Sequence, residues 1–164
     1  MAREETLPPD DILLQVTPAL PIADVWEGLV RPEHLVKWLA PRVNIAPYEG
    51  GAFELFWDEK DPTKNSTKGC TLLRFREQDE ISFTWKGPPQ FDALMNQGSE
   101  PTEVQIRIST CPEGIDVTLE HRGWKAGEAW EDARSWHFRW WDDVLHRFKD
   151  YVMTGEAPSP PTRE

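Results

Sequence analysis

The sequence predicts an α+β fold in which an antiparallel sheet of seven strands packs against a long C-terminal helix. Between residues 11 and 122, short stretches carry apolar side chains at every second position, which is typical of strands with one buried face. Residues 128–153 instead repeat apolar side chains at the spacing of a helix. Because the sheet and the helix each have one apolar face, each can cover the other.

The predicted C-terminal helix is amphipathic and extends for about 39 Å at ~1.5 Å per residue. Acidic side chains near its start suit the positive end of a helix dipole, and Gly155 followed by Pro158 ends it. One broad face carries the side chains of Trp130, Ala133, His137, Trp140, Trp141, Val144, Leu145, Phe148, Tyr151 and Val152.

The elements before this helix follow in a simple order. Residues 11–17 alternate as a first strand, which Pro18 ends. Two short helices are expected over 22–30 and 33–39, and Pro41 closes the second. Six further strands are expected at 42–46, 52–58, 70–76, 80–86, 103–110 and 115–122, with a polar loop at 59–69 and a long loop at 87–101.

The length of 164 residues predicts one domain with a substantial core. We expect a flexible arm over residues 1–9, a folded domain over 10–154, and a disordered tail over 155–164, because the tail is polar and rich in proline.

Charge and composition disfavour several classes of function. The 18 basic and 29 acidic side chains give a net charge of −11, which would repel a phosphate backbone, so nucleic acid is not an expected partner. No stretch approaches the ~20 apolar residues of a membrane span, and the first residues do not resemble a signal peptide, so a cytoplasmic location is expected. Cys70 and Cys111 are not spaced for a metal, and no cofactor motif is present.

Several stretches together resemble the START-like (SRPBCC) superfamily, and most closely its subfamily named for activators of the heat-shock protein 90 ATPase. The similar stretches are PIADVWEGLVRPEHLVKWLAP at 21–41, the Gly50-Gly51 pair, EISFTW at 80–85, LEHRGW at 119–124 and WWDDVLHRFKDYV at 140–152. The resemblance implies the helix-grip fold, a curved seven-stranded sheet wrapped around the C-terminal helix. It also implies an apolar pocket between sheet and helix, and it leaves both a chaperone partner and a homodimer open. One departure is Trp140, where the family often has glycine; a large ring there should shrink or reshape the pocket.

The sequence suggests which side chains would line such a pocket, because ligand sites are mostly apolar with a few placed polar groups. The alternative for each ring is that it only fills the core. The expected ligand-binding residues are Trp38, Phe53, Trp57, Phe75, Phe83, Trp85, His121, Arg134, His137, Trp140 and Trp141.

Three of these side chains are polar. Arg134 could hold the carboxylate or phosphate of a ligand, or it could reach solvent while its stem packs. His137 and His121 could donate to a ligand or act as acid or base, or each could be a core histidine with satisfied hydrogen bonds. Helix and strand periodicity suggest that the three side chains cluster, while no pair stands out as a nucleophile with its base.

Three functions remain open from the sequence. The first is binding of a small hydrophobic or aromatic molecule between sheet and helix, which the aromatic residues favour. The second is a partner protein that modulates a chaperone ATPase, which only the resemblance suggests. The third is an enzyme of cyclase or hydratase type that uses His137 or His121 as general acid–base.

Overall fold

The structure is a computed structural model that describes residues 9–98, 100–157 and 159–164. Apart from its last residue, the predicted N-terminal arm lies outside the described residues. The elements, in chain order, are β1 (Ile12–Val16), α1 (Ile22–Val30), α2 (Pro32–Trp38), β2 (Arg42–Ile45), β3 (Phe53–Phe56), β4 (Leu72–Arg76), β5 (Glu80–Trp85), the 3₁₀ turn η1 (Pro89–Phe91), α3 (Asp92–Met95), β6 (Thr102–Cys111), β7 (Gly114–Arg122) and α4 (Glu128–Thr154).

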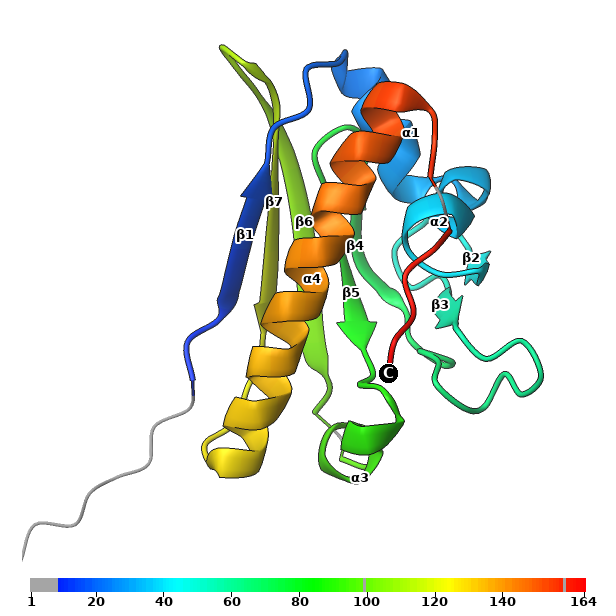
Figure 1. The fold of residues 1–164 in the computed structure, drawn as a ribbon, viewed down its shortest axis with the longest axis vertical. Helices are drawn as coiled ribbons and strands as arrows, with labels where there is room; N and C mark the ends of the chain where they lie inside the picture. The colour runs from blue at the N-terminus through cyan, green and yellow to red at the C-terminus, as the bar shows by residue number, and fades with distance from the viewer. Residues whose placement is uncertain (1–8, 99, 158) are drawn as a thin grey trace, which may run out of the picture.

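The central layer is a curved antiparallel sheet with α4 lying across its inner face (Figure 1). The strand order is β1-β7-β6-β5-β4, and every pair is antiparallel. The hairpin of β6 and β7 is the longest ladder, and its register places Ile106 beside Leu119. The predicted α+β helix-grip architecture is therefore confirmed.

The prediction of a single seven-stranded sheet needs one correction. The described residues contain seven strands, but β2 and β3 form a separate two-stranded sheet. Between β3 and β4 the ladder is reduced to an isolated bridge from Ala52 to Thr71. The second edge of β3 is hydrogen-bonded to residues 65–70, which include Asn65 at φ 44° and Gly69 at φ 90°, and such left-handed residues interrupt regular pairing.

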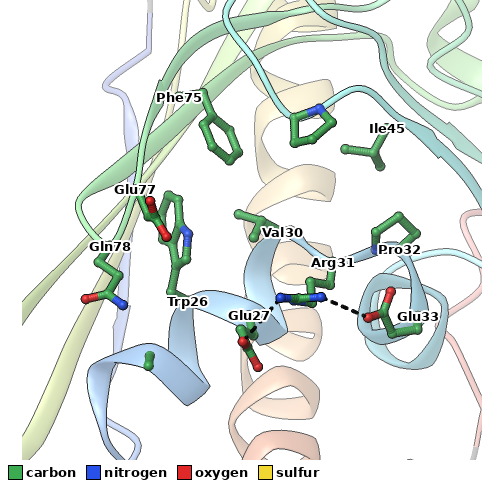
Figure 2. Close-up of a pocket in the computed structure, with 12 residues that line it drawn as sticks. Trp26, Glu27, Val30, Arg31, Pro32, Glu33, Ile45, Phe75, Glu77 and Gln78 are labelled. Carbon is green, nitrogen blue, oxygen red and sulfur yellow. Dashed lines mark hydrogen bonds and ion pairs between the residues drawn. The ribbon is translucent and has the colours of Figure 1, made fainter.

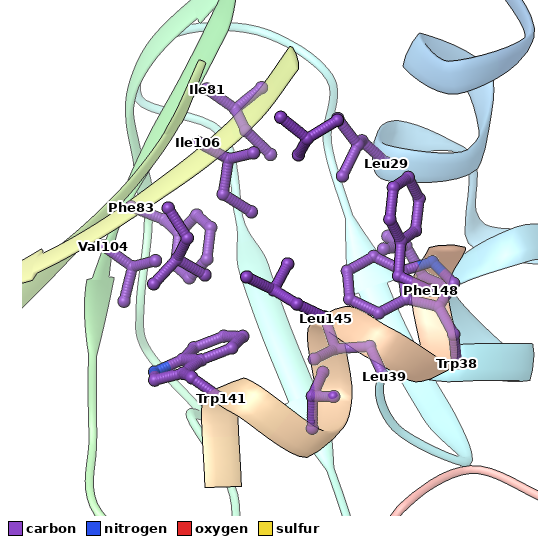
Figure 3. Packing of buried hydrophobic residues seen from close by; sticks show 14 of the residues in the cluster. Leu29, Trp38, Leu39, Ile81, Phe83, Val104, Ile106, Trp141, Leu145 and Phe148 are labelled. Carbon is purple, nitrogen blue, oxygen red and sulfur yellow. The ribbon is translucent and has the colours of Figure 1, made fainter. Parts of the chain in front are cut away.

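Helix α4 covers the core with a row of large buried side chains. Trp141, Leu145 and Phe148 are at most 1% exposed; Trp141 and Leu145 point toward the sheet, and Phe148 points toward α1 and α2 (Figure 3). Trp38 from α2 packs edge-on against Phe148, with ring centroids 4.8 Å apart. The helix ends as the sequence predicts, because Gly155 adopts φ 76° and its N–H caps the carbonyl of Tyr151.

The C-terminal segment differs from its expected disorder. From the end of α4 the chain turns back past α2 and runs beside α4 toward the end of β5 (Figure 1). Arg163 in this segment is 0% exposed, and three side chains of the domain donate hydrogen bonds to carbonyls of residues 162–164. Composition alone could not reveal this, since all the contacts that order the segment come from distant parts of the chain.

None of the helices in the described ranges is long and apolar enough to cross a bilayer. The loop predicted at 87–101 contains two short helical turns, η1 and α3, and Met95 from α3 is buried.

Candidate functional site

The space between α4 and the inner face of the sheet is occupied by aromatic rings. Trp85, at the end of β5, is 0% exposed and lies at the centre of this cluster. Its ring centroid is 5.1 Å from Trp141, 5.8 Å from Trp140 and 5.8 Å from His121. Most of the space that the sequence suggested for a ligand is therefore filled by the protein's own side chains.

Two buried histidines form a hydrogen-bonded unit with two tryptophans. His137 Nε2 accepts from the Trp85 indole N–H at 3.0 Å, so its Nδ1 carries the proton that is donated to the Ala133 carbonyl at 2.7 Å. His121 Nδ1 accepts from the Trp141 indole N–H at 3.0 Å, so its Nε2 donates to Thr102 Oγ1 at 2.9 Å. An indole N–H can only donate, and each imidazole is thereby fixed as one neutral tautomer.

Burial keeps both imidazoles uncharged. It lowers the pKa of His137 from 6.5 to about 3, and the nearby charge of Arg163 lowers that pKa further, while the bond to the Ala133 carbonyl opposes the shift. Burial, with a smaller contribution from His137, also holds the pKa of His121 well below its ordinary value. Neither histidine has a proton to give at neutral pH beyond the one already used in a hydrogen bond.

A second aromatic group lies at the flank of α4, where the C-terminal segment passes. Trp57, Trp85 and Trp140 contact one another with centroid distances of 5.7–6.1 Å. We call the space that they border the tryptophan pocket. The guanidinium of Arg163 lies over Trp57 at 4.1 Å and over Trp85 at 5.3 Å.

Arg163 is bound in this pocket entirely by neutral acceptors. Its Nε donates to Asn65 Oδ1 at 2.8 Å, its Nη1 to the Lys86 carbonyl at 2.6 Å, and its Nη2 to the Gly87 carbonyl at 3.3 Å. Burial lowers the pKa of Arg163 to about 9, so the side chain remains a cation at neutral pH. The pocket thus combines π faces with carbonyl oxygens, an environment suited to a planar cation.

An open groove of about 650 Å³ leads from the tryptophan pocket to the surface. Trp57, Asn65 and Arg163 are among its lining residues, and Asp58 and Glu59 lie on its rim.

The structure brings some of the predicted site residues together and separates others. His121 and His137 are adjacent, with ring centroids 5.3 Å apart. Arg134 is not part of their cluster, since its guanidinium donates to the carbonyls of Asp10 and Asp11.

The remaining predicted residues divide between the pocket and the core. Trp57, Trp85 and Trp140 border the tryptophan pocket, and Trp141 holds His121. Phe53 and Phe83 stack on each other at 4.0 Å within the core. Trp38 and Phe75 lie elsewhere, Trp38 donating to the Gly28 carbonyl at 2.8 Å and Phe75 packing on Trp26.

A further groove of about 460 Å³ lies between α1, α2 and the ends of β2 and β4 (Figure 2). Trp26, Phe75 and Ile45 form its apolar wall. The charged groups at its rim pair with each other, since Arg31 bridges Glu27 and Glu33. Of the predicted ligand-binding residues, Phe75 alone lines this groove.

Sequence reasoning did not identify Arg163 or Asn65 as site residues. Arg163 belongs to a proline-rich stretch with no periodicity, and Asn65 belongs to a polar loop. The only signal was the excess of tryptophans, nine in all, since their indole N–H groups need acceptors when buried. Within the described part of the chain, no group of three or more His, Cys, Asp or Glu side chains is placed to hold a metal ion.

Comparisons with known proteins identify similar sequences and folds. The sequence model of the family described as "Activator of Hsp90 ATPase homolog 1-like protein" matches residues 19–153. No curated protein matches the chain.

Three solved structures illustrate the fold similarity. Protein SSP2350 from Staphylococcus saprophyticus is 17% identical, with a TM-score of 0.71 over 94% of this chain and 100% of that one. The Aha1 dimer from Colwellia psychrerythraea is 15% identical, with a TM-score of 0.69 over 90% of this chain and 99% of that one. CalU16 from Micromonospora echinospora is 19% identical, with a TM-score of 0.65 over 90% of this chain and 77% of that one. At these identities the similarity establishes the fold alone.

Proposed function

The chain belongs to the Activator of Hsp90 ATPase homolog 1-like family, and from this premise we propose that it binds a small hydrophobic or aromatic molecule in the tryptophan pocket. One observation carries the proposal. Trp57 and Trp85 border a space that is occupied by Arg163 of the C-terminal segment, not by a side chain of the sheet or of α4, and Trp140 contacts both rings and donates to the adjacent Thr162 carbonyl. Such a space can be vacated without dismantling the core.

The location differs from the centre of the sheet–helix interface. There, Trp85, Trp141, His121 and His137 are each 0% exposed and hydrogen-bonded to one another or to the backbone. A guest at that place would break two indole–imidazole hydrogen bonds, and a buried donor without a partner costs about 1–3 kcal/mol. At the flank of α4 a guest would displace Arg163 and the Trp140–Thr162 hydrogen bond, but both indole–imidazole bonds of the core would stay intact, and the groove beside Asn65 is open.

The experiment is a titration of the full chain with 2-naphthol, a neutral planar probe, observed through the indole N–H signals in heteronuclear NMR spectra. We expect the signals of Trp57 and Trp140 to shift, since Trp140 donates to the Thr162 carbonyl that the probe would displace. The signal of Trp38, which donates to Gly28, should stay in place.

A variant pair makes the test specific. Trp57→Leu should weaken the binding of 2-naphthol about tenfold, which corresponds to ~1.4 kcal/mol. Trp130→Leu is the matched control, because Trp130 packs on Trp124 outside the tryptophan pocket and its loss should leave the affinity unchanged. Equal binding by both variants, or no shift at the solubility limit of the probe, would overturn the proposal.

We also propose that the chain acts as a partner of a chaperone ATPase and that it forms a homodimer. Its support is the family description together with the structural neighbour named as an Aha1 dimer. The measurement is the ATPase rate of purified heat-shock protein 90 with and without the chain, alongside the mass of the chain by light scattering. An unchanged ATPase rate would contradict the activator role, and a monomeric mass would contradict the homodimer.

The third function considered from the sequence, an enzyme with a histidine as general acid–base, has less support. A catalytic histidine needs a pKa near the working pH and access to the substrate. His121 and His137 are buried and neutral, and each uses both ring nitrogens in hydrogen bonds within the protein.

A further inference from the structure

The C-terminal segment, residues 159–164, is bound to the domain like a short peptide in a recognition groove. The side chains that hold it all donate to its backbone carbonyls. Arg147 donates to Ser159 at 3.1 Å, Trp140 to Thr162 at 2.8 Å, and Trp136 to Glu164 at 3.2 Å. Asn65 donates to the carbonyl of Arg163 at 2.8 Å.

Two of these four hydrogen bonds, from Arg147 and Trp136, are exposed, and the other two are partly buried. The segment belongs to no helix or strand, and Ser159, Thr162 and Glu164 are exposed. Segments with exposed hydrogen bonds and little buried apolar surface open at low free-energy cost. The exceptions are Pro161 and Arg163, which are buried, so the attachment depends chiefly on what these two side chains contribute.

The chemistry around Arg163 is that of a cation site. Two indole faces lie against the guanidinium, and an amide oxygen and two backbone carbonyls accept its protons. An arginine that only fastens a tail is commonly paired with a carboxylate, which supplies charge and bidentate geometry. Here every acceptor is neutral, so a guest with the same planar, hydrogen-bonding cation can replace the side chain without leaving a buried anion unpaired.

We propose that the tryptophan pocket is a site for a small organic cation of the guanidinium or amidinium type, and that residues 159–164 are its internal plug, with Arg163 occupying the site in place of the ligand. This inference rests on the proposed function and specifies its ligand class. A tethered occupant competes at an effective concentration of about the millimolar range. The apparent affinity for a ligand is therefore the intrinsic affinity multiplied by the fraction of molecules in which the plug is open.

The experiment uses benzamidine and benzamide, which share a planar aromatic body but differ in charge. Both are titrated into the wild-type chain and into Arg163→Ala, with the indole N–H signals of Trp136 and Trp140 reporting whether the segment leaves. We expect Arg163→Ala to bind benzamidine at least tenfold more tightly than the wild type and at least tenfold more tightly than it binds benzamide. The wild type should bind benzamidine more weakly, with both indole signals shifting as the plug is displaced.

Two further variants control for the loss of any arginine and for a failure of Arg163→Ala to fold. Arg139→Ala removes an exposed arginine of α4 and should behave as the wild type. Arg163→Met keeps much of the apolar stem; it replaces Arg163→Ala if the smaller side chain prevents folding, and it should also bind benzamidine more tightly than the wild type does.

Each alternative outcome has a distinct meaning. If Arg163→Ala binds both probes equally, the cation site is wrong while an aromatic site under the proposed function survives. If wild-type signals do not move at a hundred times the dissociation constant of the variant, residues 159–164 are a fixed wall and the plug is wrong. If neither probe binds any variant, and 2-naphthol also fails, both proposals are overturned.

Discussion

Acid should destabilise this protein through its two buried histidines. The folded-state pKa values of His121 and His137 lie below the ordinary 6.5, and that of His137 is about 3. The unfolded chain therefore binds protons that the folded chain excludes, and falling pH favours unfolding. The stability is fully present above pH 6.5 and is lost as the pH falls from 6.5 toward the folded-state pKa values.

The magnitude follows from linkage. Between pH 7.5 and 5.5, a histidine that titrates only in the unfolded state lowers the free energy of unfolding by about 1.4 kcal/mol. Two such histidines together contribute roughly 2.7 kcal/mol, a large share of a typical total of ~5–15 kcal/mol. Acidic side chains add their own pH dependence, so a comparison of variants is needed to isolate the histidines.

The assay is urea denaturation at pH 5.5, 6.5 and 7.5 for the wild type and His137→Gln. Glutamine does not titrate, and its amide oxygen can accept from the Trp85 indole. We expect the variant to lose about 1.4 kcal/mol less than the wild type across this interval. His146→Gln is the matched control, because His146 is exposed at the surface of α4. If His137→Gln shows the same pH dependence as the wild type, His137 is not held neutral and the tautomers assigned above are wrong.

Two further predictions concern packing and reactivity. Gly114→Ala should lower the free energy of unfolding by roughly 2–3 kcal/mol in urea denaturation. The reason is that Gly114 has a φ of 145° and that a new Cβ would lie 2.4 Å from the Pro18 carbonyl oxygen. Gly98→Ala is the control, because the space around Gly98 is open, and it should change the free energy of unfolding by less than about 0.5 kcal/mol. Iodoacetamide should label Cys111 in the native protein and Cys70 only after unfolding, because Cys70 is 3% exposed and burial raises the pKa of its thiol. Equal labelling rates in native protein would contradict the second prediction.

Periodicity was sufficient to predict the architecture but not the separation of the sheet. The alternation in residues 103–110 and 115–122 corresponds to the longest ladder, β6 with β7, and the helix predicted over 128–153 ends within one residue of α4. The break between β3 and β4 depends on the left-handed conformations of Asn65 and Gly69, which the polar loop sequence does not reveal.

The sequence predicts on which face of a strand or helix a site residue lies, and little more about the site. Strand alternation correctly directs His121 inward, and helical spacing directs His137 toward it, so their proximity follows from two periodic patterns. Arg134 shows where such reasoning ends, because its place near the edge of the apolar face is compatible with either the interior or the carbonyls of Asp10 and Asp11. Contacts made by non-periodic segments, such as Arg163, carry no sequence pattern at all.

Trp140, the residue at which this chain departs from the expected family pattern, is also in contact with the C-terminal segment. At the position where the resemblance led us to expect glycine, this chain has a ring that contacts Trp57 and Trp85 and donates to the Thr162 carbonyl. A glycine at this position would supply neither the third wall of the tryptophan pocket nor the hydrogen bond beside Arg163. The side chain lies between the other two rings and the C-terminal segment, since it contacts Trp57 and Trp85 and is hydrogen-bonded to Thr162. Trp140 is therefore in contact both with the aromatic cluster under α4 and with the C-terminal segment, so Trp140→Gly should loosen residues 159–164 as well as open space beside Trp57 and Trp85.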